Sequence, residues 1–74
     1  MAPYTQLTPG TVYTLRNQSK YLCLDTLEPE LPGMCRAILQ RESDGYTLIA
    51  NGTRMNADGS IEWDYSTGGH FAND

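Results

Sequence analysis

The sequence predicts a small all-β domain of about five short antiparallel strands, arranged as a curled sheet or a small, partly open SH3-like barrel. Two Asp-Gly pairs, at residues 44–45 and 58–59, each separate two apolar runs, which is the strongest short-range signal for a β-hairpin. Between residues 60 and 66 apolar and polar side chains alternate, as on a strand with one buried face. No segment shows a sustained helical period.

The 74 residues are expected to form a single domain, because a second one would be too short to bury a core. We expect residues 1–7 to be a loosely attached arm and residues 67–74 to be a frayed tail. A chain of this size buries only about 60% of the surface that its unfolded form exposes, so we expect marginal stability unless something reinforces the fold.

The N-terminal half predicts two strands joined by a polar loop. Residues 8–11 form a turn, because proline fixes φ and glycine accepts a positive φ there. The β-branched and aromatic run at residues 12–16 is the first strand, and residues 21–26 are the second. Residues 17–20 form the hairpin loop between them. Residues 28–33 then include two prolines and a glycine and must form an irregular connection.

The C-terminal half predicts a three-stranded meander. By propensity residues 35–42 suit a helix as well as a strand, and the Asp-Gly pair that follows favours a strand paired with residues 46–50. The Asn-Gly pair at residues 51–52 is either a hairpin turn or a bulge that bends one long strand over residues 46–55. We favour the bulge, because the three residues after it are too few for a useful strand. The second Asp-Gly pair turns the chain into the last strand, residues 60–66.

Nine acidic and five basic residues give the chain a formal net charge of −4 at pH 7. The basic residues are scattered, and they form no basic stripe along the sequence. A protein that binds nucleic acid non-specifically needs clustered Lys and Arg to displace counterions from the phosphates, so we exclude that function. The modest acidic charge favours solubility.

Neither a secretory nor a membrane segment is expected. The first residues lack the basic start and apolar stretch of a signal peptide, and no apolar run approaches the roughly 18 residues that a membrane helix needs. These features favour a cytoplasmic protein that does not associate with membranes. In a reducing compartment Cys23 and Cys35 are expected to be buried thiols, with a disulfide between them as the alternative.

No metal or cofactor is expected. The segment around the second Asp-Gly pair resembles a calcium loop at first sight, but placing Gly59 sixth puts Arg54 first and Tyr65 twelfth, where carboxylates are needed. The two cysteines and the single histidine are spaced too far apart for a usual structural zinc site, which draws its ligands from close pairs. We therefore interpret the Asp-Gly segment as a turn.

No catalytic residue is assigned, and we expect the chain not to be an enzyme. One of the cysteines with His70 and Asp64 would supply a nucleophile, a base and an orienting group. However, a lone histidine in a glycine-rich terminal segment is poorly held, and catalysis needs rigid support. A small thiol-dependent enzyme is kept as the least favoured alternative.

Five residues of the last strand and its tail are the candidates for partner binding. Aromatic side chains dominate the energetics of protein interfaces, and two carboxylates two residues apart share one face of a strand. The plainer interpretation places the aromatic side chains in the core and lets the carboxylates keep an edge strand soluble. The candidates are Trp63, Tyr65, Glu62, Asp64 and His70.

Residues 58–71, together with residues 36–39, resemble small uncharacterised proteins of gut Gram-positive bacteria and their mobile elements. The resemblance covers residues 10–71. It implies a bacterial cytoplasmic setting and an accessory role on mobile DNA. It transfers no catalytic or binding assignment to any position of this chain.

The function we expect is that of a non-enzymatic interaction module, which binds another protein through a sheet face or an exposed edge strand. One alternative is an acidic decoy that mimics nucleic acid and inhibits a DNA-binding protein. Self-association is a further alternative, because so small a domain gains stability from it. The decoy requires five carboxylates to cluster, those of Asp25, Glu28, Glu30, Glu62 and Asp64.

Overall fold

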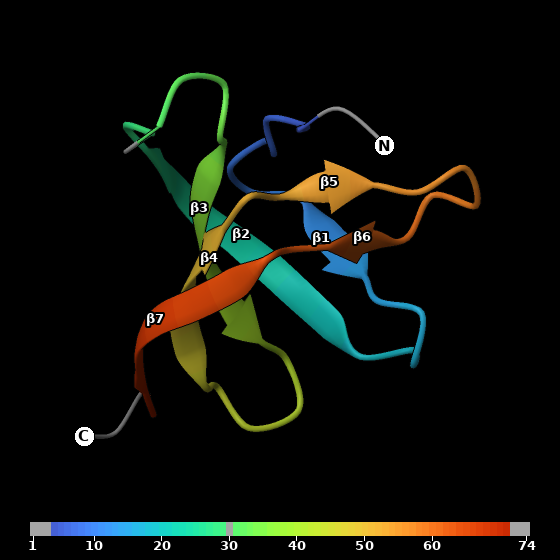
Figure 1. Ribbon diagram of the computed structural model, residues 1–74. Helices are drawn as coiled ribbons and strands as arrows, with labels where there is room; N and C mark the ends of the chain where they lie inside the picture. The colour runs from blue at the N-terminus through green and yellow to red at the C-terminus, as the bar shows by residue number, and fades with distance from the viewer. Residues whose placement is uncertain (1–3, 30, 72–74) are drawn as a thin grey trace.

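The computed structural model describes residues 4–29 and 31–71. This part of the chain forms a five-stranded antiparallel sheet and a two-stranded hairpin (Figure 1), and it contains no helix. Within it, no helix is long and apolar enough to cross a membrane. The strands are β1 (Val12–Thr14), β2 (Lys20–Leu27), β3 (Arg36–Arg41), β4 (Thr47–Asn51), β5 (Arg54–Met55), β6 (Ile61–Glu62) and β7 (Tyr65–His70).

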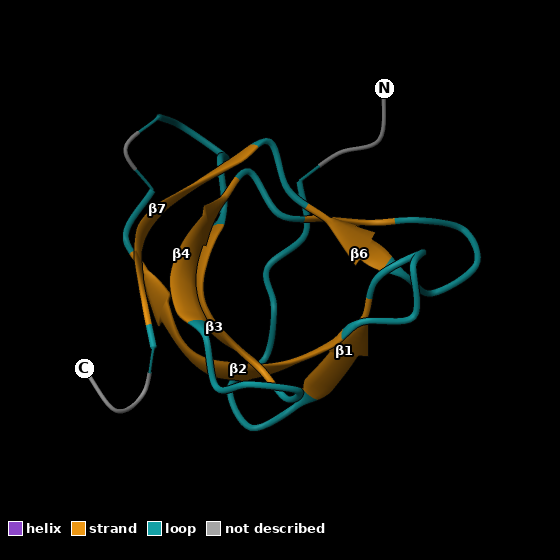
Figure 2. Ribbon diagram, turned by 90° about the horizontal axis from the view of Figure 1, so that it is seen from below, coloured by secondary structure: helices purple, strands orange, loops and turns teal. Residues whose placement is uncertain are grey.

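The main sheet is curled but open. Its strand order is β1-β2-β3-β4-β7, and every neighbouring pair is antiparallel. Strands β1 and β7 occupy the two ends, and Figure 2 shows the curl that brings the β5–β6 hairpin towards β1. The all-β prediction is confirmed, and the sheet does not close into a barrel. Strands β3, β4 and β7 are neighbours, which is the expected meander.

Strands β4 to β7 form one long hairpin that is folded over near its middle. Asn51 of β4 pairs with Tyr65 of β7, and Arg54 of β5 pairs with Glu62 of β6, so the register is the same on both sides of the fold. The chain bends at Gly52, where φ is 77°. The long strand therefore bends where the sequence indicated, although neither side gains the extra residue that defines a bulge.

The C-terminal residues extend the sheet further than expected. Residues 67–70, expected to break the last strand and fray, belong to β7, which pairs with β4 as far as His70. The register shifts by one residue between the Thr47–His70 pair and the Ile49–Thr67 pair. The shift arises because β7 has two residues there, both glycines, where β4 has one. Residues 67–70 therefore lie in a paired strand where the sequence predicted a break and a frayed tail, and residues 72–74 lie outside the described residues.

The N-terminal arm is attached to the domain. Leu7 is only 2% exposed and belongs to the core. The backbone N–H of Thr5 donates to the carbonyl of Thr53 at 2.8 Å, and the Thr53 hydroxyl donates to the carbonyl of Thr5 at 2.7 Å. Residues 4–7, which the sequence predicted to be part of a loosely attached arm, therefore contact the domain in this structure, and residues 1–3 lie outside the described residues.

The core gathers side chains from the arm, from β2, β3 and β4, and from β6. On the three sheet strands alternate residues point into it, as the pleat requires. Both cysteines are free thiols, and Cys23 is buried as expected, whereas Cys35 is partly exposed. The buried members of the core are Leu7, Tyr21, Cys23, Ala37, Leu39, Leu48, Ala50 and Ile61.

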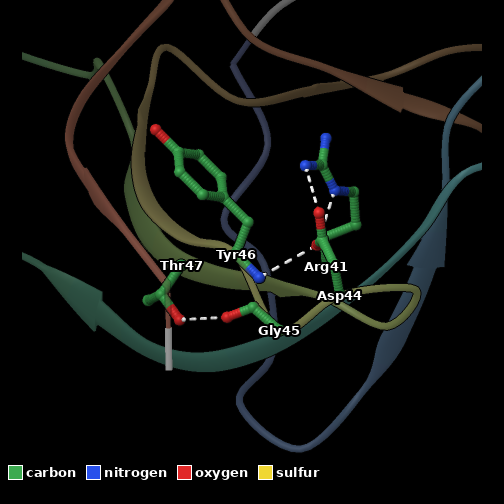
Figure 3. Close-up of polar contacts among 5 residues, drawn as sticks. All are labelled: Arg41, Asp44, Gly45, Tyr46 and Thr47. Atoms are coloured by element: carbon green, nitrogen blue, oxygen red, sulfur yellow. Dashed lines mark hydrogen bonds and ion pairs between the residues drawn. The ribbon is translucent and has the colours of Figure 1, made fainter. Parts of the chain in front are cut away.

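The first Asp-Gly pair closes the β3–β4 hairpin in the loop of residues 42–46 (Figure 3). The Asp44 carboxylate accepts two hydrogen bonds from the Arg41 guanidinium, from Nε at 2.9 Å and from Nη2 at 2.7 Å. It accepts a third from the backbone N–H of Tyr46 at 3.1 Å. The guanidinium also lies over the Tyr46 ring, 5.3 Å from its centroid. These hydrogen bonds, chiefly those from Arg41, lower the pKa of Asp44 from 3.8 to about 2.

The lowered pKa of Asp44 predicts that the stability of the fold depends on pH in the acid range. Because the pKa of Asp44 is lower in the folded chain, its carboxylate stabilises the fold above pH 3.8, and that contribution is lost as the pH falls towards 2. We expect Asp44→Asn to be less stable than the wild type at neutral pH, with the difference vanishing near pH 2. Thermal unfolding followed by circular dichroism across this range measures it.

The matched control for the acid dependence is Asp25→Asn. Asp25 is an exposed residue of β2. Within the described residues its carboxylate accepts one hydrogen bond, from the backbone N–H of Thr26 at 2.8 Å. The control is expected to follow the acid dependence of the wild type. A constant gap between Asp44→Asn and the wild type down to pH 2 would contradict the assignment to the Asp44 carboxylate.

Candidate functional site

A groove of about 350 Å³ lies at the opening of the curled sheet. One wall is the turn that follows β1, and the other is β6 with the residue after it. Figures 1 and 2 both show β1 and β6 next to one another on this side of the molecule. The groove is lined by Leu15, Arg16, Asn17, Ile61, Glu62 and Trp63.

The first wall is held by a tight turn between β1 and β2. The N–H of Gln18 donates to the carbonyl of Leu15 at 3.0 Å, and the N–H of Leu15 donates to the carbonyl of Ser19 at 2.8 Å. The Asn17 side chain accepts the N–H of Ser19 at 3.0 Å. Gln18 has a φ of 74°, a value that glycine usually provides. The turn therefore presents Arg16 and Asn17 at its tip in a fixed conformation.

The second wall follows a turn of the same construction between β5 and β6. The N–H of Gly59 donates to the carbonyl of Asn56 at 3.0 Å, and the N–H of Asn56 donates to the carbonyl of Ser60 at 2.7 Å. The Asp58 side chain accepts the N–H of Ser60 at 2.9 Å. Hydrogen bonds from Ser60 lower the pKa of Asp58, and the charge of Arg16 contributes in the same direction. The charges of the two turns therefore act on one another across the groove.

The floor of the groove is apolar. Ile61 is 1% exposed and belongs to the core. Trp63 packs against that core with its ring edge-to-face on Tyr21, at 5.4 Å between centroids and 82° between planes. Trp63 and Leu15 are only partly buried, so part of each side chain faces the groove. Apolar surface in a concave site of this kind is what a binding pocket provides.

Beside the groove, Arg54 holds the two acidic candidates. Its guanidinium lies 2.7 Å from Asp64 and 3.5 Å from Glu62. The hydroxyl of Tyr4 donates to Asp64 at 2.9 Å, and this hydrogen bond raises the pKa of Tyr4. Glu62 therefore lines the groove as part of an ion pair with Arg54. Asp64 connects Arg54 and Tyr4 at the point where the long hairpin folds over.

This pairing weakens the decoy hypothesis. A nucleic-acid mimic needs free carboxylates arranged together, and Arg54 neutralises two of the five that were expected to cluster. Among the others, Asp25 and Glu28 belong to β2 and the loop after it, and Glu30 lies outside the described residues.

The last two candidates lie on β7, away from the groove. All six residues of β7 are exposed, and Tyr65 is 48% exposed, so the interpretation that placed it in the core is wrong. The Nδ1 atom of His70 lies 3.2 Å from the carbonyl oxygen of Gly68. The five candidates from the sequence therefore do not form one site. Trp63 and Glu62 line the groove, and Asp64 pairs with Arg54 beside it. Tyr65 and His70 lie on the edge strand β7.

The described residues offer little support for thiol or metal chemistry. Burial raises the pKa of the Cys23 thiol, which keeps it protonated and makes it a poor nucleophile. The Cys35 thiol lies 3.8 Å from the carbonyl of Gly33. Within residues 4–29 and 31–71, no three His, Cys, Asp or Glu side chains gather as metal ligands would.

Sequence reasoning missed the first wall of the groove, which Leu15, Arg16 and Asn17 form. The available signal is an apolar residue followed by a cation immediately before a hairpin loop. That pattern indicates a loop tip that can contact a partner, but it does not reveal that the tip lies beside a strand more than forty residues further along the chain.

Together the fold and the groove define a small, open, all-β domain with a partly apolar groove at the opening of its sheet. Comparisons with protein-family models, with curated proteins and with solved structures found no match. The function of the chain is therefore inferred from the geometry of the groove and of the strand edges.

Proposed function

We propose that this chain is a non-enzymatic protein-interaction module of partly open, SH3-like architecture, whose groove binds an extended segment of a partner protein. The observation that carries the proposal is an apolar floor between the turn that follows β1 and strand β6, next to two strands, β1 and β6, that each have one unpaired edge in the described part of the chain. Among the described residues β1 pairs only with β2, and β6 pairs only with β5. An extended segment would supply backbone groups to such edges, as in other cases of strand addition.

The groove favours a segment with an apolar side chain at its centre. Leu15, Ile61 and Trp63 form a floor for one such side chain. A volume of about 350 Å³ lies at the lower end of the range of pockets that bind small ligands, which suits one or two side chains rather than a folded surface. Arg16 on one wall and Glu62 on the other favour a segment without strong net charge. The resemblance to proteins of bacterial mobile elements suggests a bacterial partner.

Trp63 provides a direct test, because it is the only tryptophan of the chain and lines the groove. Titration with a library of short peptides, each with an apolar residue at its centre, is expected to yield members that shift the Trp63 emission to shorter wavelength in a saturable manner. For those members Leu15→Ala is expected to raise the Kd by about tenfold, because it removes apolar contact worth roughly 1.4 kcal/mol.

The matched control is Leu24→Ala. Leu24 is an exposed leucine of β2, a strand with a neighbour on each side, and it does not line the groove, so this variant is expected to bind the same peptides with the wild-type Kd. Circular dichroism verifies that both variants fold. A library in which no peptide shifts the emission, or equal affinity of Leu15→Ala and the wild type, would overturn the groove as the binding site.

A further inference from the structure

The main sheet has a second unpaired edge, at the opposite end from the groove. Among the described residues β7 pairs with β4 on one side only, and all six residues of β7 are exposed. A row of free backbone N–H and C=O groups is a template for pairing with another strand. This edge is separate from the groove, so an interaction at β7 does not depend on the proposed function.

Strand β7 lacks the side chains that usually protect an edge. It contains no Lys, Arg, Asp, Glu or Pro. The carboxylates that the sequence analysis assigned to edge protection lie elsewhere: Glu62 is on β6, and Asp64 precedes β7 and is held by Arg54 at 2.7 Å. The register shift opposite β4 is the one protective feature that we find along this edge. It places an extra residue in β7 at Gly68 and Gly69, so the regular part of the edge is Tyr65–Thr67.

Charge indicates which partner fits this edge. The chain carries a net charge of −4, so two copies repel one another over most orientations. The strip formed by β7 carries no formal charge when its histidine is neutral, so two copies can approach there without like charges meeting. An antiparallel pair of identical strands is also self-complementary about a two-fold axis, the commonest symmetry of protein dimers.

We propose that a second copy of this chain pairs with β7, antiparallel about a two-fold axis near Thr67, so that the two sheets become one. The small side chains at the centre of β7, from Ser66 to Gly69, allow the two backbones to approach closely. The exposed Tyr65 of each copy then adds apolar surface along the seam, whereas Gly69 is already covered by the Tyr46 side chain of its own copy. The dimer also supplies the reinforcement that so small a domain needs.

Sedimentation velocity over a range of concentrations tests the proposal. The wild type is expected to show a reversible monomer–dimer equilibrium. Ser66→Lys places a cation on the exposed edge and is expected to raise the dimer Kd at least tenfold, because lysine on an edge opposes strand pairing. The matched control is Ser43→Lys, the same change at an exposed position of the β3–β4 loop, which is expected to leave the Kd unchanged.

A cross-linking experiment locates the axis independently of that variant. In a Cys35→Ser background, oxidation of Thr67→Cys is expected to give a covalent dimer, whereas Thr11→Cys, exposed at the opposite end of the sheet, is expected to remain monomeric. A wild type that stays monomeric at all concentrations, a Ser66→Lys dimer as strong as the wild type, or equal cross-linking of both cysteine variants would overturn the proposal. Peptide-dependent Trp63 fluorescence would still test the groove, so the two proposals fail separately.

Discussion

Replacing Leu7 with alanine is expected to lower the free energy of unfolding by about 2–5 kcal/mol, although Leu7 precedes the first strand. The side chain is 2% exposed and packs in the core with residues of β2, β3, β4 and β6. Removing it leaves a cavity that the surrounding strands fill only in part, and this adds to the lost burial of apolar surface. Urea denaturation followed by circular dichroism measures the effect.

Leu31→Ala is the matched control for Leu7. Leu31 lies in the connection between β2 and β3 and is 61% exposed, so its truncation is expected to change the free energy of unfolding by no more than about 0.5 kcal/mol. The comparison separates a core role from the general effect of losing a leucine. Equal, small losses in both variants would show that the arm is loosely attached in solution, as its sequence suggested.

The turns show what local sequence predicts well. Both Asp-Gly pairs close hairpins where expected, and each works through the same two features. Asp44 and Asp58 accept the backbone N–H two residues further on, at 3.1 Å and 2.9 Å, and the glycine between has a positive φ. Such contacts span only a few residues, so their signature is complete within a short stretch of sequence.

The errors occur where long-range contacts decide the outcome. The alternation of residues 60–66 places Ile61 correctly in the core and Trp63 partly there, but it fails for Tyr65. A period of two describes a straight strand, and here the strand bends beyond Trp63 and continues as an exposed edge. Leu7 was missed for a related reason, because the strands that bury it come from distant parts of the chain.

The candidate site was predictable in part for the same reason. Trp63 and Glu62 were identified from the sequence and do line the groove, whereas the opposite wall comes from the β1–β2 turn. Only the curl of the sheet brings these two segments together (Figure 2). A sequence pattern indicates which face of a strand is apolar, but it does not indicate which loop lies across from it.

The corner of the long hairpin carries the second large expected effect. Gly52→Ala is expected to lower the free energy of unfolding by about 2–4 kcal/mol, from backbone strain and a steric clash together. The φ of Gly52 is 77°, and an added Cβ would lie 2.5 Å from a carboxylate oxygen of Asp64 and 3.0 Å from the ring of Tyr4. The carboxylate would have to move, which would disturb its ion pair with Arg54.

Gly10→Ala separates the two contributions to that loss. Gly10 has a φ of 87°, but no atom of the described residues lies within 4 Å of an added Cβ, so this variant has the backbone strain without the clash. It is expected to lose about 1 kcal/mol in urea denaturation, so that the excess loss in Gly52→Ala measures the close packing at the corner. That corner also orients β6 and therefore one wall of the groove. Equal losses in both variants would mean that the contact between Gly52 and Asp64 does not hold the hairpin in its folded-over shape.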